Sequence, residues 1–389
     1  MIYRRFGRTE LTLPVFSCGG MRYQQSWTRG TAVSAASQRN LEATIDRALA
    51  LGIDHIETAR GYGTSEAQLG IALARHPRDS FRLQTKGAPT EDPREFERNL
   101  EESFALLRVA HVDLFSFHGL NNARQVERTL RAGGCWEVAE HWQRAGRIRH
   151  IGFSTHGPTR LILDAIASGR FEYLNLHYYY IFQDNRPALD AAAAADMGVF
   201  IISPTDKGGR LQSPPAKLRA LAAPLSPMVF NDLYCLSHPQ IHTLSLGAAR
   251  PSDFDEHLAV LPLLDDPLPV LEPIVQRLDE AYRVAIGDEF ARRWREGLRD
   301  WNELPGQVNV RRILWLWNLV RAYDLVAFAQ ERYAAMDPND HWVPGAKAAH
   351  IDDAALVAAL PASPFRRELP RFLREAHAVL YNPDVVGGP

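Results

Sequence analysis

Cysteine is scarce in this chain of 389 residues, and only Cys18, Cys135 and Cys235 occur. They lie far apart and form no CxxC pairing. A disulfide framework or a metal site built on sulfur would need more cysteines at closer spacing, so the sequence argues against both. We expect each of the three to act as a small buried hydrophobic residue.

Long apolar runs and an excess of one charge are missing as well. No stretch approaches the roughly 20 apolar residues of a membrane-spanning helix. The N-terminus, MIYRRFGRTELTL, carries charges where a signal peptide would need an apolar core. We therefore expect a cytoplasmic protein without a membrane partner. Lys and Arg number 44 against 46 Asp and Glu, so no positive excess favours nucleic acid as a partner.

The overall composition is that of an ordinary globular protein, with 46% hydrophobic and 23% charged residues. The length exceeds what a single core usually supports, which favours a large domain followed by a smaller one.

Short apolar runs alternate with amphipathic segments from Val15 to about Val260, which predicts parallel strands joined by helices. We predict strands over Val15–Gly19, Ile53–Glu57, Phe81–Lys86, Val112–His118, Ile148–Ser154, Tyr173–His177, Val199–Ser203 and Thr243–Gly247. Eight units of this kind have the size of one TIM barrel, an α/β fold of (β/α)8 type. The alternative, a doubly wound open sheet, usually carries GxGxxG after its first strand, and that motif is absent here.

Local signals place some of the remaining elements. Helices are predicted to start at Asn40, at Asp92 with Pro93, and at Gly157 with Pro158. The segment Tyr3–Leu13 is expected to form a small hairpin that closes the bottom of the barrel.

A proline-rich linker follows Val260, and the rest of the chain has a helical pattern, clearest over Arg311–Met336. We therefore expect a barrel over residues 1–285 and a small all-α domain over residues 286–389.

Four polar residues stand at the ends of adjacent predicted strands, where a TIM barrel builds its active site. Glu57 ends the second strand, Tyr62 lies in the loop after it, Lys86 ends the third strand and His118 ends the fourth. A phenol has a pKa near 10, and a neighbouring ammonium lowers it, so we expect Lys86 to activate Tyr62. Glu57 would offset the buried charge of Lys86, and His118 would orient a carbonyl substrate or share the proton.

Each of these residues also has an ordinary explanation. A lysine at a strand end is usually solvated, and a single histidine is more often structural. Tyr62 is harder to explain as packing, because Gly61 and Gly63 flank it and leave little core to join. The four residues together carry more weight than any one of them.

These segments resemble the aldo/keto reductases. GIDHIETARGYGTSE is similar to that family's second strand and tyrosine loop, QTKG to its lysine strand and VDLFSFHG to its histidine strand. The order and spacing of the motifs hold across about two thirds of the chain. The resemblance implies that Glu57, Tyr62, Lys86 and His118 form a catalytic tetrad and that NAD(P)H binds across the mouth of the barrel.

The resemblance also implies the cofactor-binding positions. Ser154, Thr155 and Asn175 match positions that bind the nicotinamide carboxamide, although Ser154 and Thr155 could equally cap the helix that follows. The remaining positions would lie along the dinucleotide and at its adenosine end, and they are Ser203, Pro204, Gly208, Gly247, Arg250 and Glu256.

Two residues depart from the family pattern. Glu57 stands where Asp is commoner, which lengthens the side chain by one methylene. Asp253 lies near the position of an arginine that binds the 2′-phosphate of NADP in many relatives. A carboxylate there would repel this phosphate, although Arg250 is close enough in sequence to compensate. We expect NADP as the cofactor and keep NAD as the alternative.

The C-terminal region resembles the helical ferredoxin-like extension of some aldo/keto reductases, through ILWLWNLVRAYDL, QERY, HWVPGAKA and FLREAH. Such extensions hold iron-sulfur clusters through cysteines. The corresponding positions here are Trp294, Gly297, Asp300 and Leu304, and His350, Asp353, Leu356 and Leu360. We expect no iron-sulfur cluster and no metal, and interpret His350 and Asp353 as a solvated helix face rather than a metal site.

Taken together, the sequence predicts a reductase that takes hydride from a nicotinamide cofactor and reduces an aldehyde or ketone, with Tyr62 as proton donor. The alternative is a nucleotide-binding redox sensor or partner subunit with little turnover, whose helical domain contacts another protein. The sequence does not identify the carbonyl substrate or the oligomeric state.

Overall fold

The computed structural model describes residues 1–338 and 342–387. His341, which opens the HWVPGAKA motif, lies outside the described residues. The chain divides into two compact units, of which the first contains residues 1–208 and 231–267 and the second contains residues 209–230 and 268–389.

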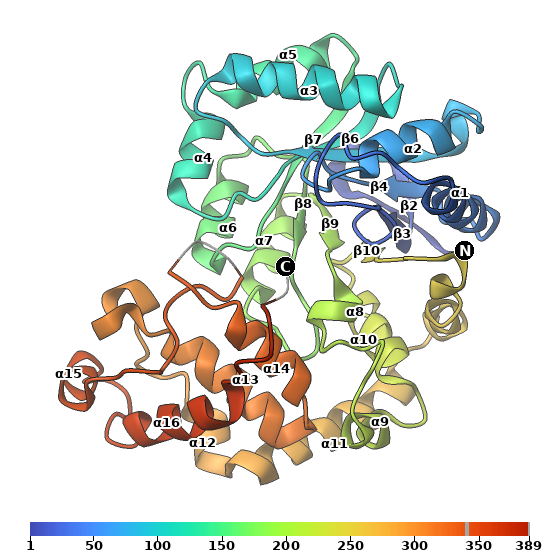
Figure 1. Ribbon diagram of the computed structural model, residues 1–389. Helices are drawn as coiled ribbons and strands as arrows, with labels where there is room; N and C mark the ends of the chain where they lie inside the picture. Colours follow the sequence, from blue (N-terminus) through green and yellow to red (C-terminus); the bar gives the residue numbers. More distant parts are fainter. Residues whose placement is uncertain (339–341, 388–389) are drawn as a thin grey trace. The chain divides into compact units, whose positions relative to one another are not determined.

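The first unit is built on a closed barrel of eight parallel strands, which confirms the predicted fold class (Figure 1). In barrel order the neighbours are β10, β3, β4, β5, β6, β7, β8 and β9. Their bounds are β3 Phe16–Gly19, β4 His55–Glu57, β5 Arg82–Gly87, β6 Val112–Phe117, β7 Ile148–Ser154, β8 Tyr173–Leu176, β9 Gly198–Ile201 and β10 Thr243–Leu246. Nearly every strand residue is buried, because helices cover the outside while side chains fill the inside.

Helices connect successive strands of the barrel. Their bounds are α1 Ala35–Ala50, α2 Ser65–Leu73, α3 Pro93–Leu107, α4 Ala123–Leu130, α5 Cys135–Arg144, α6 Thr159–Ala167, α7 Arg186–Ala194, α8 Pro204–Lys207 and α10 Pro227–Leu236. Helix α3 starts as predicted, with the Asp92 side chain accepting a hydrogen bond from the amide of Arg94 at 2.9 Å. The predicted start of α1 at Asn40 is wrong, because Ser34 caps this helix and the Asn40 side chain instead donates to the carbonyl of Ala249 at 2.7 Å.

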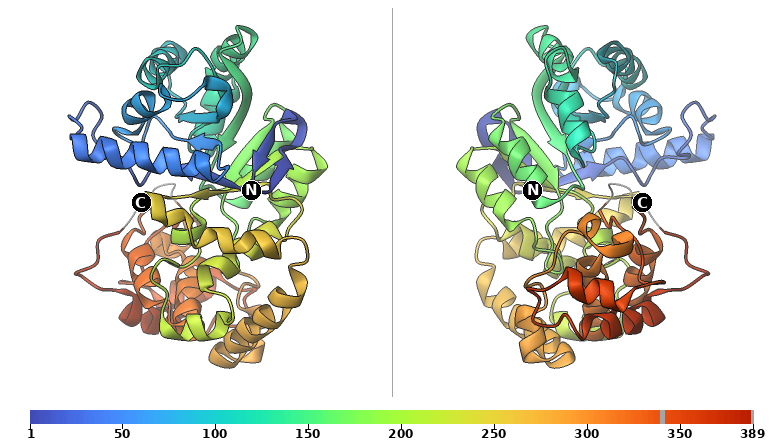
Figure 2. Two further views of the ribbon diagram at one scale, coloured as in Figure 1. Left: turned by 90° about the vertical axis from the view of Figure 1, so that its right-hand side faces the viewer. Right: turned by 90° about the vertical axis from the view of Figure 1, so that its left-hand side faces the viewer.

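The hairpin predicted near the N-terminus consists of β1, Tyr3–Arg5, and β2, Thr12–Pro14, paired antiparallel. Its Phe6 side chain joins Tyr173 and Phe200 in a cluster of buried residues that forms the floor of the barrel. Gly198, the first residue of β9, permits this approach, because a Cβ atom there would lie 2.7 Å from the Phe6 ring. Figure 2 shows the hairpin, in dark blue, beside segments that come much later in the sequence.

A polar layer lies above this floor inside the barrel. The Gln84 amide nitrogen donates to Ser116 Oγ at 3.0 Å and its carbonyl oxygen contacts His55 Nε2 at 3.1 Å. Ser116 Oγ is also 3.0 Å from the Tyr173 hydroxyl and 3.4 Å from Asn175 Oδ1. Burial lowers the pKa of His55 to about 4, so its imidazole is neutral near pH 7.

The second unit is helical. Its helices are α9 Ala216–Ala222, α11 Leu268–Ile286, α12 Asp288–Arg293, α13 Val310–Tyr323, α14 Val326–Ala334, α15 Asp353–Ala359 and α16 Leu369–Leu380. Helix α13 is almost wholly buried and packs against α11, α14 and α16 (Figure 1). The amphipathic stretch predicted over Arg311–Met336 is helical and contains α13 and α14, which are separated where Asp324 adopts a left-handed conformation at φ 62°. None of the described helices is both long and apolar enough to span a membrane.

Candidate active site

The C-terminal ends of three neighbouring strands bring the predicted tetrad together. Glu57 is the last residue of β4, Lys86 is the penultimate residue of β5, and His118 directly follows β6. The register pairs Glu57 with Gln84 and Lys86 with Ser116, so Lys86 lies two residues further along β5 than the residue that pairs with Glu57. Tyr62 comes from the loop between β4 and α2.

The Lys86 side chain is only 2% exposed, and protein groups replace water around its ammonium group. It forms an ion pair with Glu57 and donates a hydrogen bond to the carbonyl of Thr58 at 3.0 Å. The other carboxylate oxygen of Glu57 accepts a hydrogen bond from Ser245 Oγ at 2.7 Å. These contacts offset the cost of removing two charges from water. Sequence reasoning missed Ser245, for which the only signal is a hydroxyl between two leucines in strand β10.

Glycines shape the loop that carries Tyr62. Gly63 has φ +53°, and a Cβ atom on it would lie 1.8 Å from the carbonyl oxygen of Ser26. The amide of the next residue, Thr64, donates to that same carbonyl at 2.9 Å. Only glycine fits this close approach, which turns the loop back over the strand ends.

The Tyr62 ring makes three contacts in this position. It meets the His118 ring edge to face, with 5.7 Å between ring centres and an angle of 87°. The Trp27 ring meets it in the same manner at 6.4 Å. The Lys86 ammonium nitrogen lies 5.1 Å from its centre, within the range of a cation–π interaction.

The predicted lowering of the Tyr62 pKa is wrong in its net direction. Burial of the phenol raises its pKa and outweighs the lowering caused by the charge and hydrogen bonding of Lys86. The pKa of Lys86 is raised too: burial acts to lower it, but Glu57 and Tyr62 outweigh that effect. Burial and the charge of Lys86 lower the pKa of His118 to about 3, so its imidazole is neutral at physiological pH.

Ser154 ends β7, Thr155 directly follows it and Asn175 lies on β8, and all three are buried. Neither hydroxyl caps α6, whose N-cap is Pro158, so the capping interpretation is wrong. Instead, Ser154 Oγ accepts a hydrogen bond from the amide of Gly119 at 3.1 Å, and Thr155 Oγ1 donates to the carbonyl of Leu120 at 2.7 Å. Both hydroxyls therefore fix the loop that follows His118.

Asn175 has an unused donor. Its Oδ1 atom accepts from the polar layer of the barrel, whereas its Nδ2 atom is buried and has no hydrogen-bond partner within the described part of the chain. An unpaired buried amide donor is costly, so this atom fits a ligand that brings an acceptor.

The candidate positions after β9 and β10 lie in short segments. Ser203 adopts a left-handed conformation at φ 51° and precedes Pro204, the first residue of α8, and Gly208 is the C-cap residue that follows this helix. A Cβ atom on Gly247 would lie 3.1 Å from Arg22 Cδ, so the Arg22 side chain passes directly over this glycine. The Arg22 guanidinium lies 3.6 Å from the Asp206 carboxylate. Sequence reasoning did not single out Arg22, because its neighbours are distant in sequence.

Arg250 and Glu256 are both exposed. The Arg250 guanidinium donates to Asp253 Oδ1 at 3.0 Å, and the other oxygen of Asp253 accepts from the amide of Ala249 at 2.9 Å. The positive charge that was expected to offset Asp253 is therefore paired with it.

Large apolar side chains occupy half of the eight positions that correspond to the cluster cysteines of a ferredoxin-like extension. Trp294, Leu304, Leu356 and Leu360 are buried, whereas Gly297, Asp300 and His350 are exposed. Asp353 pairs with Arg374 through contacts of 2.6 and 2.9 Å. Within residues 1–338 and 342–387, no group of three or more His, Cys, Asp or Glu side chains could hold a metal ion.

Comparison with known proteins places this chain in a family. The family model "Aldo/keto reductase family" matches residues 16–213, just over half of the chain. The chain therefore belongs to the aldo/keto reductases, a family of oxidoreductases.

Solved structures show the same barrel. A thermostable aldo-keto reductase, Tm1743, in complex with the inhibitor epalrestat, is 21% identical with a TM-score of 0.60, and the alignment covers 71% of this chain and 100% of that one. The holo form of aldo-keto reductase AKR11C1 from Bacillus halodurans is 19% identical with a TM-score of 0.59, covering 71% of this chain and 96% of that one. At this identity the likeness establishes the fold.

Proposed function

We propose that this protein reduces an aldehyde or ketone to an alcohol, using NADPH or NADH, with Tyr62 as the proton donor. The observation that carries the proposal is the buried ion pair of Lys86 and Glu57 next to the Tyr62 ring, at the mouth of an aldo/keto reductase barrel.

The tetrad residues have separate tasks in this reaction. Tyr62 donates its phenolic proton to the carbonyl oxygen as negative charge develops there. Lys86 stabilises the phenolate that remains, and Glu57 holds the ammonium in place. His118 is neutral, so it can donate a hydrogen bond to the substrate oxygen without adding a second positive charge beside Lys86.

The cofactor would lie along the strand ends that follow the tetrad. The unpaired Nδ2 atom of Asn175 is suited to the carboxamide oxygen of nicotinamide, and Ser154 and Thr155 shape the adjacent loop. Arg22, above Gly247, is a cation that could meet the pyrophosphate. Ser203, Pro204 and Gly208 would line the dinucleotide. When bound, the cofactor supplies the hydride.

The adenosine end would reach Arg250 and Glu256. We keep NADP as the expected cofactor, with NAD as the alternative. Because Arg250 already pairs with Asp253, we expect the preference for NADP over NAD to be weak. A 2′-phosphate placed here would meet a cation that is already paired.

The helical unit has no catalytic task in this proposal. Its resemblance to a ferredoxin-like extension without cluster cysteines and its use as a protein-binding surface stay predictions from the sequence. The same holds for a cytoplasmic location and for the lack of a nucleic-acid partner.

A direct test adds NADPH and NADH separately to the full-length protein, measures binding by cofactor fluorescence, and then supplies a panel of small aldehydes and ketones. We expect binding of at least one cofactor and its oxidation in the presence of a carbonyl compound. Binding without oxidation on any compound would instead favour the redox sensor.

A further inference from the structure

A second group of polar side chains surrounds a cavity at the opposite end of the barrel from the tetrad. Arg82 is the first residue of β5, His111 directly precedes β6, and Arg149 is the second residue of β7. Arg78 belongs to the short helix η2, Arg78–Ser80, that leads into β5. The cavity has a volume of about 450 Å³.

The positive charge around this cavity is only partly balanced. Asp113 is fully buried, and its two oxygens accept hydrogen bonds from Arg78 at 2.7 Å and from Arg149 at 2.8 Å. Arg82 has no carboxylate within 4.0 Å among the residues that the structure describes, and its guanidinium donates only to the backbone carbonyl of Asp79 at 3.3 Å. The Asp79 side chain is exposed. Three guanidinium groups thus surround the fully buried carboxylate of Asp113, and the carboxylate of Asp54 also interacts electrostatically with Arg82.

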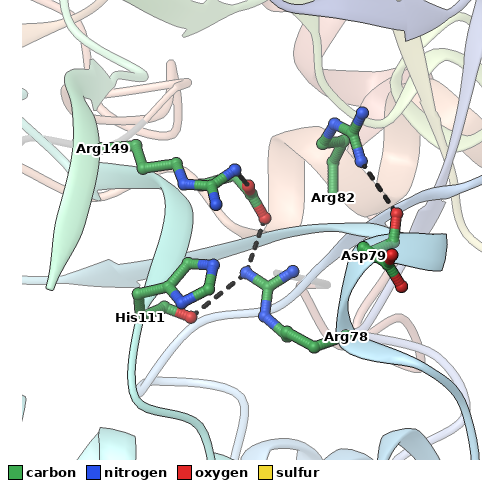
Figure 3. Close-up of a pocket in the computed structure, with 6 residues that line it drawn as sticks. Arg78, Asp79, Arg82, His111 and Arg149 are labelled. Carbon is green, nitrogen blue, oxygen red and sulfur yellow. Dashed lines mark hydrogen bonds and ion pairs between the residues drawn. The ribbon is translucent and has the colours of Figure 1, made fainter. Parts of the chain in front are cut away.

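Two guanidinium donors and one imidazole nitrogen at the cavity have no hydrogen-bond partner in the described parts of the chain. They are the buried atoms Arg78 Nε, Arg82 Nε and His111 Nε2. Figure 3 shows Arg149 and His111 on one side of Arg78 and Arg82 on the other. Buried donors without acceptors are rare and costly in folded proteins, and a ligand that brings acceptors removes this cost.

We propose that this cavity is a binding site for a small molecule that carries a phosphate group. A planar carboxylate is satisfied by one guanidinium, whereas a phosphate has three terminal oxygens that accept from several directions. The guanidinium donors here come from η2, β5 and β7 and approach from different sides, which matches the phosphate. The site lies at the N-terminal ends of the strands and does not depend on the proposed reductase function.

Arg82→Gln is the most informative variant. It removes the guanidinium without a carboxylate partner and leaves both bonds to Asp113 intact, so the barrel should still fold. Arg149→Gln is the second variant, since this side chain is half exposed. Arg75→Gln is the matched control, because Arg75 is a surface arginine of the same unit that pairs with Glu42 and Asp46 away from the cavity.

The experiment titrates inorganic phosphate into the full-length protein by calorimetry, in a buffer without other oxyanions, and repeats the titration with citrate. We expect phosphate to bind in the millimolar range or tighter, with Arg82→Gln and Arg149→Gln each weakening it by about ten- to a hundredfold and Arg75→Gln leaving it unchanged. Far-ultraviolet circular dichroism checks that the variants are folded.

Four results would overturn the proposal, and the first three concern the wild-type protein and the Arg82→Gln variant. These three are the absence of phosphate binding to the wild-type protein, equal binding by wild type and a folded Arg82→Gln variant, and tight binding of citrate without phosphate. An equal loss in Arg75→Gln would also overturn it, because the effect would then be one of general surface charge.

Discussion

The ammonium nitrogen of Lys86 lies 5.1 Å from the centre of the Tyr62 ring and is held there by an ion pair with Glu57. This relationship joins a buried strand residue to a loop residue. It is the arrangement on which the proposed proton transfer depends.

Tyr62→Phe removes the hydroxyl that is the proposed proton donor and keeps the aromatic ring with its contacts. We expect kcat for carbonyl reduction to fall by about 10²- to 10⁴-fold. Cofactor affinity, measured by fluorescence titration, should stay close to that of the wild type. Tyr3→Phe, which removes a phenol from the N-terminal hairpin, is the control and should keep full activity. An active Tyr62→Phe enzyme would refute the assignment.

Glu57→Gln leaves the buried Lys86 ammonium without its counterion. We expect the free energy of unfolding in urea to fall by about 3–5 kcal/mol. Lys86→Met should cost a similar amount, because it leaves a buried carboxylate. The double variant should lose clearly less than the sum of the two single losses. Additive losses would show that the two side chains do not interact.

The pH profile of reduction should be flat from about pH 5 to about pH 9. His118, with a pKa of about 3, is neutral over this whole range. Tyr62, with a pKa above its usual value, keeps its proton until the solution becomes strongly basic. Because the donor must be protonated, the rate should fall only as the pH rises through that raised pKa. A step near pH 6.5 that disappears in His118→Gln would contradict this prediction.

Asp253→Asn tests the cofactor preference. The change frees the Arg250 guanidinium and removes a negative charge near the expected 2′-phosphate. The ratio of kcat/KM for NADPH to that for NADH should rise by up to about fivefold, as expected for an exposed ion pair. The effect should shrink at high salt. An unchanged ratio would place the adenosine end elsewhere.

Gly198→Ala tests the floor of the barrel. Its Cβ atom would lie 2.7 Å from three carbon atoms of the Phe6 ring. We expect a loss of about 1–3 kcal/mol in the free energy of unfolding, as for other overpacked cores. Phe6→Leu in the same chain should recover part of this loss by making room. If alanine is tolerated at Gly198 without any loss, the close approach is not needed.

Much of the barrel could be predicted from the sequence, because strands that are buried on both sides appear as short apolar runs such as VDLFSF in β6. The positions at which helices begin and end were harder to predict. The first turn of α1 contains no large apolar residue, so periodicity located its start near Asn40 rather than after Ser34.

The candidate site could be predicted in part, because Glu57, Lys86 and His118 stand at the ends of such runs. Ser245 and Arg22 could not, since each acts on a residue far away in the sequence. The net pKa shift of Tyr62 depends on how deeply the loop buries the phenol, and that depth is a property of the folded chain.

The hairpin at the N-terminus has a consequence for the order in which the molecule assembles. Phe6 packs against Tyr173 and Phe200, and the amide of Arg8 donates to the carbonyl of Asp196. The hairpin must therefore wait for a segment that is made nearly two hundred residues later in the chain. Contacts that span so much chain form slowly, because the intervening loop has to close first. A nascent chain truncated before β9 would lack Phe200, so Phe6 would keep Tyr173 but not its full set of native partners.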